Sequence, residues 1–448
     1  VYWLYNITGD AFLLQLAEII HKQTFDYTNN FLNTDLLTRP GSIHCVNLAQ
    51  GIKGPLIYYQ HHPDKKYIDA TEKGFKDIRK FNGLAHGLYG GDEGLHGNDP
   101  TQGSEFCSAV ELMFSLESIL LVTGNVSYAY QLERIAFNAL PSQATDDFNG
   151  RQYFQQANQI MATRHKRNFD TDHAGTDVCF GLLTGYACCT SNMHQGWPKF
   201  TQNLWYATAH NGLAALVYAP TQVKAFVGNG AEVNIREETG YPFNETISFT
   251  ISFDKNPQGI NFPFHLRIPA WCTNGATVKI NGTQHSQYKA GQIVKLNRNW
   301  KTGDKVELHL PMHVYKSTWV ENSIAVERGP LVYALKMEED WNEVKNDRDP
   351  IEYGSSYFEV RSRTPWNFAL PDVGADKMQE TFRVSKTKEQ LPAYPWNLQN
   401  APIEIKTKGI RVPWWKEYNE MSGPIPYSIV HDLPRDVVQE EITLIPYG

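Results

Sequence analysis

Residues 105–124, EFCSAVELMFSLESILLVTG, combine a strong helical pattern with Glu105 and Cys107, two residue types that bind metals. Apolar side chains recur three and four residues apart, as at Val110 and Met113, and this spacing predicts a helix. The same periodicity predicts helices over residues 1–34, 44–60, 66–80, 126–141 and 193–209. Gly-rich segments separate them. Residues 1–211 are therefore predicted to be all-α, with about half of the helices that a closed double ring requires.

The period of the apolar pattern changes to two from residue 212 onward, which is typical of strands. Together with turn signals such as Asn281-Gly282, this alternation predicts a β-sandwich over residues 212–315. Residues 316–448 mix further strands with proline-rich loops and are predicted to form a second β-rich domain. The predicted strands are 214–218, 245–251, 265–268, 277–280, 305–310, 323–327, 331–334 and 442–445. The expected fold class is therefore multidomain, α then β.

Composition excludes few functions but argues against two partners. The 448 residues carry 41 basic and 48 acidic side chains, a net charge of −7 that gives no electrostatic reason to expect nucleic acid or an anionic membrane. The sequence has no run of roughly 20 apolar residues and no signal-peptide pattern, so targeting cannot be read, and an extracytoplasmic or periplasmic location is only slightly favoured over a cytoplasmic one. The 11 Trp and 23 Tyr suit carbohydrate recognition, as they do many β-rich proteins.

Six cysteines lie at positions 45, 107, 179, 188, 189 and 272, too few for a disulfide scaffold in a chain of this length. Adjacent Cys188 and Cys189 are poorly placed to bridge each other, which favours metal or thiolate chemistry. Glu105, Cys107, Cys188 and Cys189 would supply four ligands of the types that Zn²⁺ accepts. The alternative is that Cys107 packs in a core and Glu105 is an exposed acid at a helix start.

Six motifs follow one another along the chain: Gly90-Gly91-Asp92-Glu93-Gly94, Ser104-Glu105-Phe106-Cys107, Leu132-Glu133-Arg134-Ile135-Ala136-Phe137-Asn138, Ala187-Cys188-Cys189, Leu266-Arg267-Ile268-Pro269-Ala270-Trp271 and Glu327-Arg328-Gly329-Pro330-Leu331-Val332-Tyr333. In this order they resemble the β-L-arabinofuranosidase family of glycoside hydrolases, over roughly residues 1–340. The resemblance implies an (α/α)₆ catalytic barrel, of which this chain carries the C-terminal half, followed by β-sandwich domains.

The resemblance also implies a chemistry. One Glu and three Cys hold zinc, which assigns Glu105, Cys107, Cys188 and Cys189 as ligands, Cys188 as the nucleophile and Glu93 as the acid/base. A metal-bound thiol is deprotonated at neutral pH, so Cys188 needs no dedicated base. Attack at the anomeric carbon, followed by hydrolysis with the same Glu, predicts retention of configuration. Adjacent Asp92 competes with Glu93 for the acid/base role. The alternative for Glu93 is that it is only a solvated acid in a loop.

Three further residues are predicted to contact the sugar, and two of them, His44 and Glu133, match family positions. His44 has a capping or structural role as its alternative. The alternative for Glu133 is a position beside Arg134 on an exposed helix face. Tyr153 is a weaker candidate, since Tyr153 and Phe154 suit a strand core equally well.

The leading function is a retaining exo-glycoside hydrolase that removes a terminal β-L-arabinofuranosyl or similar sugar from an oligosaccharide or glycan. A non-catalytic carbohydrate-binding protein with a structural zinc is the first alternative, and only the catalytic function requires Glu93 near Cys188. A zinc-free thiolate–imidazole hydrolase using His194 is a remote alternative. Because the apolar stripe starts at Val1, the natural protein is expected to carry roughly 100–200 further N-terminal residues, about one domain. Nothing in the sequence predicts the oligomeric state.

Overall fold

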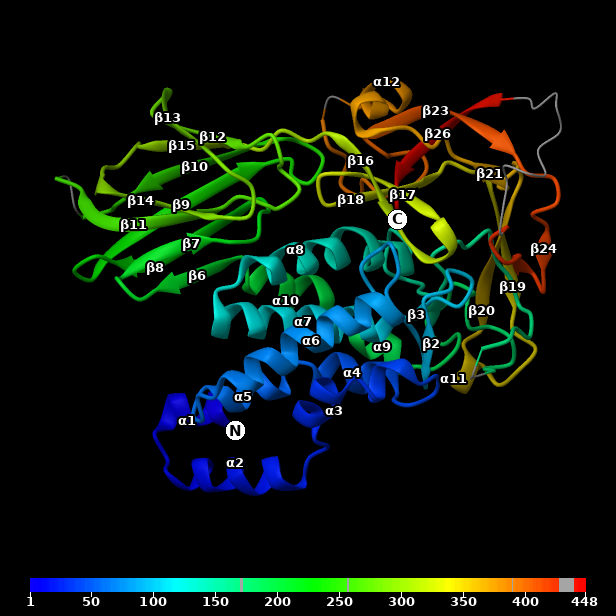
Figure 1. Ribbon diagram of the computed structural model, residues 1–448, viewed down its shortest axis with the longest axis horizontal. Helices are drawn as coiled ribbons and strands as arrows, with labels where there is room; N and C mark the ends of the chain where they lie inside the picture. Colours follow the sequence, from blue (N-terminus) through cyan, green and yellow to red (C-terminus); the bar gives the residue numbers. More distant parts are fainter. Residues whose placement is uncertain (170–171, 256–257, 389, 427–438) are drawn as a thin grey trace.

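The computed structural model of the chain describes residues 1–169, 172–255, 258–388, 390–426 and 439–448 (Figure 1). A helical part built from the first half of the chain lies beside two groups of β-sheets (Figure 1). Its helices are α1 (Tyr2–Thr8), α2 (Phe12–Gln23), α3 (Tyr27–Asn33), α4 (Cys45–Gly51), α5 (Gly54–Tyr59), α6 (Lys65–Phe81), α7 (Phe106–Thr123), α8 (Val126–Arg134), α9 (Cys188–Met193) and α10 (Gly196–Gln202). The predicted α-then-β fold class is confirmed.

Helix α7 is the centre of the helical part and packs against α4, α8, α9 and α10. It ends at Gly124, whose φ of 62° lies in the left-handed region that glycine adopts at helix ends. The helix is long and apolar enough to cross a membrane, but two thirds of it, 67%, is buried within the molecule, as expected for a core helix.

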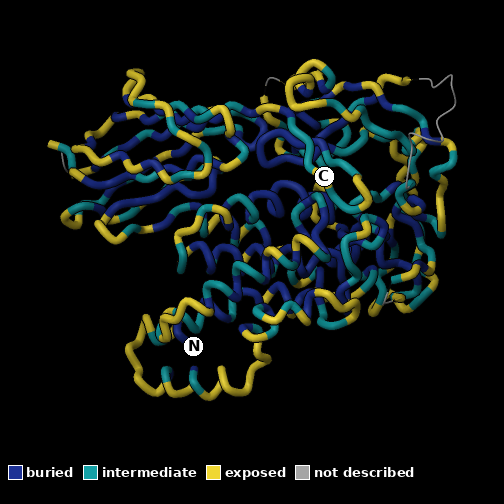
Figure 2. The backbone as a smooth tube through the Cα atoms, viewed as in Figure 1, coloured by how far each residue is buried: buried dark blue, intermediate teal, exposed yellow. Residues whose placement is uncertain are grey.

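The predicted helix 1–34 is wrong as a single helix, because the chain breaks it twice. Gly9 adopts a left-handed φ of 74° after α1, and Asp26 caps α3 by accepting a hydrogen bond from the Asn29 backbone N–H. Apolar side chains on α1 and α2 stay exposed, including Trp3 at 75% and Phe12 at 60% (Figure 2). The presence of further N-terminal residues stays a prediction.

A β-sandwich follows the helices, and its two sheets have strand orders β13-β12-β15-β10-β9-β8 and β14-β11-β7-β6. Its strands are β6 (Trp205–Thr208), β7 (Gly212–Ala215), β8 (Thr221–Val227), β9 (Ala231–Thr239), β10 (Thr246–Ser252), β11 (Ile260–Arg267), β12 (Ala276–Ile280), β13 (Thr283–Tyr288), β14 (Ile293–Trp300) and β15 (Lys305–His309). Aromatic side chains fill the space between the sheets, with Phe249 and Phe264 packed edge to face. The predicted helix 193–209 is wrong over its last residues, where β6 pairs with β7.

The rest of the chain builds a seven-stranded sheet, and the main strands are β16 (Val314–Thr318), β17 (Ile324–Arg328), β18 (Leu331–Leu335), β23 (Ile403–Arg411) and β26 (Gln439–Pro446). A smaller sheet has the order β19-β20-β5 and joins β19 (Glu339–Lys345) and β20 (Ser356–Ser362) to β5 (Met161–Ala162). Because β5 lies between α8 and α9 in sequence, this sheet attaches the last part of the chain to the loops of the helical part. The division of the chain at residues 211 and 315 stays a prediction.

Candidate functional site

The residues predicted as metal ligands converge. One ligand atom from each of Glu105, Cys107, Cys188 and Cys189 lies within 4.8 Å of the other three. Glu105 immediately precedes α7 in an extended conformation, and its side chain caps no backbone N–H, so the carboxylate is free to face the cysteines. Cys188 and Cys189 begin α9, which packs on α7 and brings them to the first turn that contains Cys107. Only Cys188 is exposed.

The separations suit one tetrahedral ion. Sγ of Cys107 lies 3.2 Å from Sγ of Cys189. Oε1 of Glu105 lies 3.8 Å from the Sγ atoms of both Cys188 and Cys189. Tetrahedral zinc with Zn–S bonds near 2.3 Å separates its ligand atoms by about 3.5–3.8 Å. The set of three thiols and one carboxylate therefore fits zinc. Glu105 is 1% exposed, so the alternative of an exposed helix-start acid is wrong.

The carboxylate of Glu105 is shared between two groups of partners. Its Oε1 faces the thiols, whereas its Oε2 lies 3.2 Å from His44 Nε2 and accepts a hydrogen bond from the Cys45 thiol at 3.2 Å. The Ser108 hydroxyl lies 2.9 Å from Cys45 Sγ and completes this buried group. The hydrogen bond to Glu105 raises the pKa of His44. Sequence reasoning missed Cys45, although its position next to His44 was a signal.

The three thiols differ in their acidity. Hydrogen bonds from Cys107 and Cys189 lower the pKa of Cys188 and outweigh the opposite effect of burial, and the nearby Arg151 guanidinium lowers this pKa further. Burial and its two thiol neighbours raise the pKa of Cys189, and the hydrogen bond to Cys188 raises that of Cys107. The exposed thiol is thus the one most readily deprotonated.

Arg151 organises the loop that leads to Cys188, and sequence reasoning missed it. Its side chain is fully buried and donates to the backbone carbonyls of Leu182, Thr184 and Tyr186, and its Nε donates to the Thr190 hydroxyl at 3.2 Å. A buried guanidinium surrounded by carbonyls fixes a loop strongly, because each lost contact leaves a buried charge unpaired. Nothing in the pattern around Arg151 distinguishes it from a surface arginine.

Glu93 lies at the open side of the cluster. Its Oε1 accepts a hydrogen bond from the Tyr153 hydroxyl at 3.4 Å, its Oε2 lies 3.7 Å from His44 Nε2, and its side chain is 41% exposed. Asp92 is fully buried and lies 2.8 Å from His96 Nε2, while its backbone carbonyl accepts from Cys45 N–H. Of the two acids, only Glu93 has the access to solvent and the open carboxylate that a proton donor needs.

Glu133 belongs to a buried polar network outside the thiol cluster, and its predicted sugar contact stays a prediction. It is fully buried, pairs with the Arg267 guanidinium and accepts a hydrogen bond from the Tyr241 hydroxyl at 2.7 Å. The alternative for Glu133, an exposed position on a helix face, is wrong because the side chain is fully buried. Arg134, the next residue, pairs with Glu327 of β17. The 132–138 motif and the two motifs around Arg267 and Glu327 therefore join the helical part to the β-sheets.

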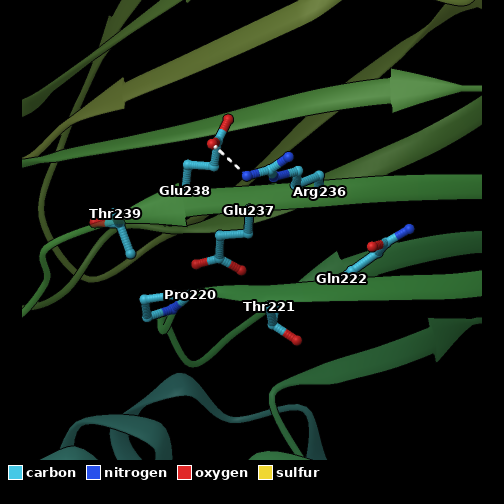
Figure 3. Close-up of a pocket in the computed structure, with 7 residues that line it drawn as sticks. All are labelled: Pro220, Thr221, Gln222, Arg236, Glu237, Glu238 and Thr239. Carbon is cyan, nitrogen blue, oxygen red and sulfur yellow. Dashed lines mark ion pairs between the residues drawn. The ribbon is translucent and has the colours of Figure 1, made fainter. Parts of the chain in front are cut away.

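Two cavities lie away from the cluster. One of about 480 Å³ lies at the edge of the sandwich, where Glu237 points from β9 toward Pro220 while Arg236 and Glu238 point to the opposite face (Figure 3). Another of about 520 Å³ lies between α6, α8 and β16. None of the residues lining either cavity belongs to the thiol cluster, where Cys188 and the nearby Glu93 side chain are exposed to solvent.

Known proteins resemble the chain in both sequence and fold. A "non-reducing end β-L-arabinofuranosidase" from Bifidobacterium longum subsp. longum is 25% identical over 264 residues, which is 56% of this chain and 38% of that protein. A crystal structure of a GH127 β-L-arabinofuranosidase from Geobacillus stearothermophilus T6 matches with a TM-score of 0.64 at 21% identity, covering 90% of this chain and 58% of that one. A structure described as a glycoside hydrolase matches with a TM-score of 0.67 at 19% identity, covering 99% of this chain and 70% of that one.

The chain thus spans well under half the length of the curated relative that it matches. The model of the GH127 β-L-arabinofuranosidase catalytic domain matches residues 1–202, and the model of the GH127 middle domain matches residues 212–312. Together these two matches take in most of the chain, and the chain belongs to the GH127 β-L-arabinofuranosidase family of glycoside hydrolases.

Proposed function

We propose that the protein is a retaining exo-glycoside hydrolase in which the Cys188 thiolate is the nucleophile and Glu93 is the acid/base. The observation that carries this proposal is the position of an exposed, acidified thiol inside a zinc-type ligand set, with one solvent-accessible carboxylate at its open side. Glu105, Cys107, Cys188 and Cys189 would hold the zinc ion. When bound, zinc supplies the positive charge that keeps the cysteines deprotonated at neutral pH.

The first half of the reaction transfers the sugar to the protein. The sulfur of Cys188 attacks the anomeric carbon and forms a C–S bond while the glycosidic C–O bond breaks. Glu93 donates its proton to the departing oxygen, so the leaving group departs as an alcohol.

The second half restores the protein. Glu93, now a carboxylate, removes a proton from water, the water oxygen attacks the anomeric carbon, and the C–S bond breaks to return the Cys188 thiolate. Two inversions at the same carbon give net retention. Tyr153 and His44, which lie on the two oxygens of Glu93, hold its carboxyl group toward the cluster. Both would also contact sugar hydroxyls, His44 with its partly exposed ring and Tyr153, which is 1% exposed, with its hydroxyl group alone.

A terminal β-L-arabinofuranosyl residue of an oligosaccharide or glycan is the substrate that we propose. The name of the Bifidobacterium longum relative supports this sugar and the removal of it from a chain end. A zinc that only stabilises the fold would need no exposed carboxylic acid near its ligands. Glu93 lies 3.7 Å from His44, which contacts the ligand Glu105, so Glu93 favours the catalytic function. For the thiolate–imidazole alternative, no hydrogen bond or ion pair joins His194 to Cys188 in the described ranges.

Turnover of a panel of 4-nitrophenyl furanosides and pyranosides, with zinc measured in the same samples, tests the proposal. We expect hydrolysis of the β-L-arabinofuranoside, and NMR of the first product should show the β-anomer because configuration is retained. Binding of sugars without hydrolysis of any member of the panel would contradict the proposal and favour the carbohydrate-binding alternative.

A further inference from the structure

Three aromatic rings form a platform on the small sheet β19-β20-β5. Trp341 of β19 lies with its ring centroid 5.1 Å from Phe180 and 6.1 Å from Phe358 of β20. Trp341 is 45% exposed and Phe358 is 36% exposed. The Trp341 indole N–H donates to Glu339 at 2.8 Å, which fixes the ring on the sheet. We call these three residues the aromatic platform.

The register of the strands places all three rings on one face. Trp341 is opposite Val360 and Phe358 is opposite Glu343, so Trp341, Glu343 and Phe358 point the same way. Phe180 forms an antiparallel bridge with Phe358 and shares its face. Glu339 and Glu343 border the platform, and the Ser356 hydroxyl donates to Glu343 at 2.7 Å. The surface combines flat rings with acceptors for hydroxyl groups.

One short loop joins the platform to the thiol cluster along the chain. The loop begins at Phe180, exposes Leu182 and Tyr186, and ends at Cys188. Even a fully extended chain of this length spans at most about 28 Å. The loop is shorter than this limit, because its carbonyls converge on Arg151. An oligosaccharide of a few residues that starts at Cys188 can therefore reach Trp341.

We propose that the aromatic platform binds the leaving-group portion of a neutral oligosaccharide whose terminal sugar lies at Cys188. The proposal rests on the proposed function, because it assigns the platform to the substrate of that same site. Sugar rings present apolar C–H faces that stack on exposed aromatic rings, while their hydroxyl groups donate to carboxylates. Glu339 and Glu343 beside the rings outnumber Lys345, the cation that follows them on the same face of β19, so the platform repels a uronic acid and selects a neutral chain.

A protein partner fits this surface poorly. A fully buried aromatic side chain contributes about 150–250 Å², and these rings are already partly covered, so the platform offers less than the roughly 800 Å² per partner of a stable protein complex. The area instead matches one or two sugar residues.

The ratio of kcat/KM on a neutral arabinofuranosyl tetrasaccharide to kcat/KM on 4-nitrophenyl β-L-arabinofuranoside tests the platform. Trp341→Ala should lower this ratio about fivefold, the typical value of one aromatic contact, and Trp341→Phe should restore part of it. Phe226→Ala is the matched control, because Phe226 is an exposed aromatic residue at 72% on strand β8 of the sandwich and should leave the ratio unchanged. An unchanged ratio in Trp341→Ala would overturn the proposal.

Calorimetric titration separates failure of the platform from failure of the catalytic proposal. The same tetrasaccharide is titrated into Cys188→Ser and Cys188→Ser/Trp341→Ala, and the second variant should bind about fivefold more weakly. A tetrasaccharide of the same length that carries a uronic acid should bind Cys188→Ser more weakly than the neutral one. If the protein hydrolyses no glycoside but binding still depends on Trp341, only the catalytic proposal fails. Binding that is independent of Trp341, or absent, overturns the platform.

Discussion

Glu105 and Glu133 are both buried glutamates of the helical part, yet their surroundings differ in kind. Around Glu133 the acceptors are matched by donors, since Arg267 pairs with one carboxylate oxygen and Tyr241 donates to the other. Around Glu105 three thiols and a half-buried imidazole gather without a fully charged cation in contact with the carboxylate. The first arrangement pairs both carboxylate oxygens with donors of the protein, although Arg267 Nη1 stays without a hydrogen-bond partner. The second gathers anion-forming groups that repel one another once deprotonated unless a cation joins them.

The comparison shows how burial alone misleads. Both carboxylates have nearly zero exposure, and burial raises the pKa of Glu133 in spite of its arginine. What separates a binding site from a domain connection is whether the local charges and hydrogen bonds are already satisfied. The thiol cluster is the unsatisfied one, and it is the one that opens to solvent at Cys188 and Glu93.

Cys188→Ser tests the cluster with the largest expected effect. A serine hydroxyl stays protonated at neutral pH and attacks an acetal carbon poorly, so kcat/KM should fall at least about a thousandfold. Cys272→Ala is the matched control, because Cys272 is a buried cysteine of the sandwich outside the cluster, and its variant should keep activity. Near-native turnover by Cys188→Ser would reduce Cys188 to a ligand.

Glu93→Gln and Asp92→Asn separate the two adjacent acids. Loss of a general acid lowers kcat by about 10²–10⁴, and Glu93→Gln should do so without lowering the melting temperature, because Glu93 is partly exposed. Asp92→Asn should destabilise the fold instead, since Asp92 is buried against His96. Kinetics on glycosides with good and poor leaving groups measure the loss of general-acid catalysis, and the melting temperatures of both variants measure the loss of stability. The assignment is wrong if Asp92→Asn loses turnover at unchanged stability while Glu93→Gln stays active.

Glu133→Ala tests the satisfied side of the comparison. It leaves the Arg267 guanidinium buried and unpaired, which costs about 3–5 kcal/mol of folding free energy. Urea denaturation should show this loss, while the zinc content per folded chain stays the same as in the wild type. The double variant Glu133→Ala/Arg267→Met should recover part of the stability, because it removes both charges. A loss of zinc without a loss of stability would place Glu133 in the active site after all.

Glu117 offers a smaller, pH-dependent test within α7. Burial raises its pKa from 4.5 to about 8, and its Oε2 accepts a hydrogen bond from Asn203 at 2.8 Å. The folded chain therefore holds a proton that the unfolded chain releases near pH 4.5, so this contribution to stability is complete below that pH and is lost as the pH rises to 8. Glu117→Gln should flatten the fall in melting temperature between pH 5 and 8. An identical slope in both proteins would contradict the raised pKa.

The sequence predicted the α-then-β order and the convergent Glu105, Cys107, Cys188 and Cys189, because periodicity and ligand type are local properties. It could not predict the break between α1 and α2, which depends on a left-handed glycine, or the strand β6, which depends on pairing with β7. The pairing of Glu133 with Arg267 could not be predicted for a related reason. An acid that meets an arginine 134 positions away cannot be distinguished by its neighbours in sequence from one that binds sugar.

X-ray absorption at the zinc edge, on protein purified under reducing conditions, tests the central claim most directly. We expect one zinc per chain with three sulfur ligands near 2.3 Å and one light-atom ligand near 2.0 Å, and Cys188→Ser should lower the sulfur count to two. Zinc bound with nitrogen ligands only, or a sulfur count that does not change in Cys188→Ser, would contradict the account.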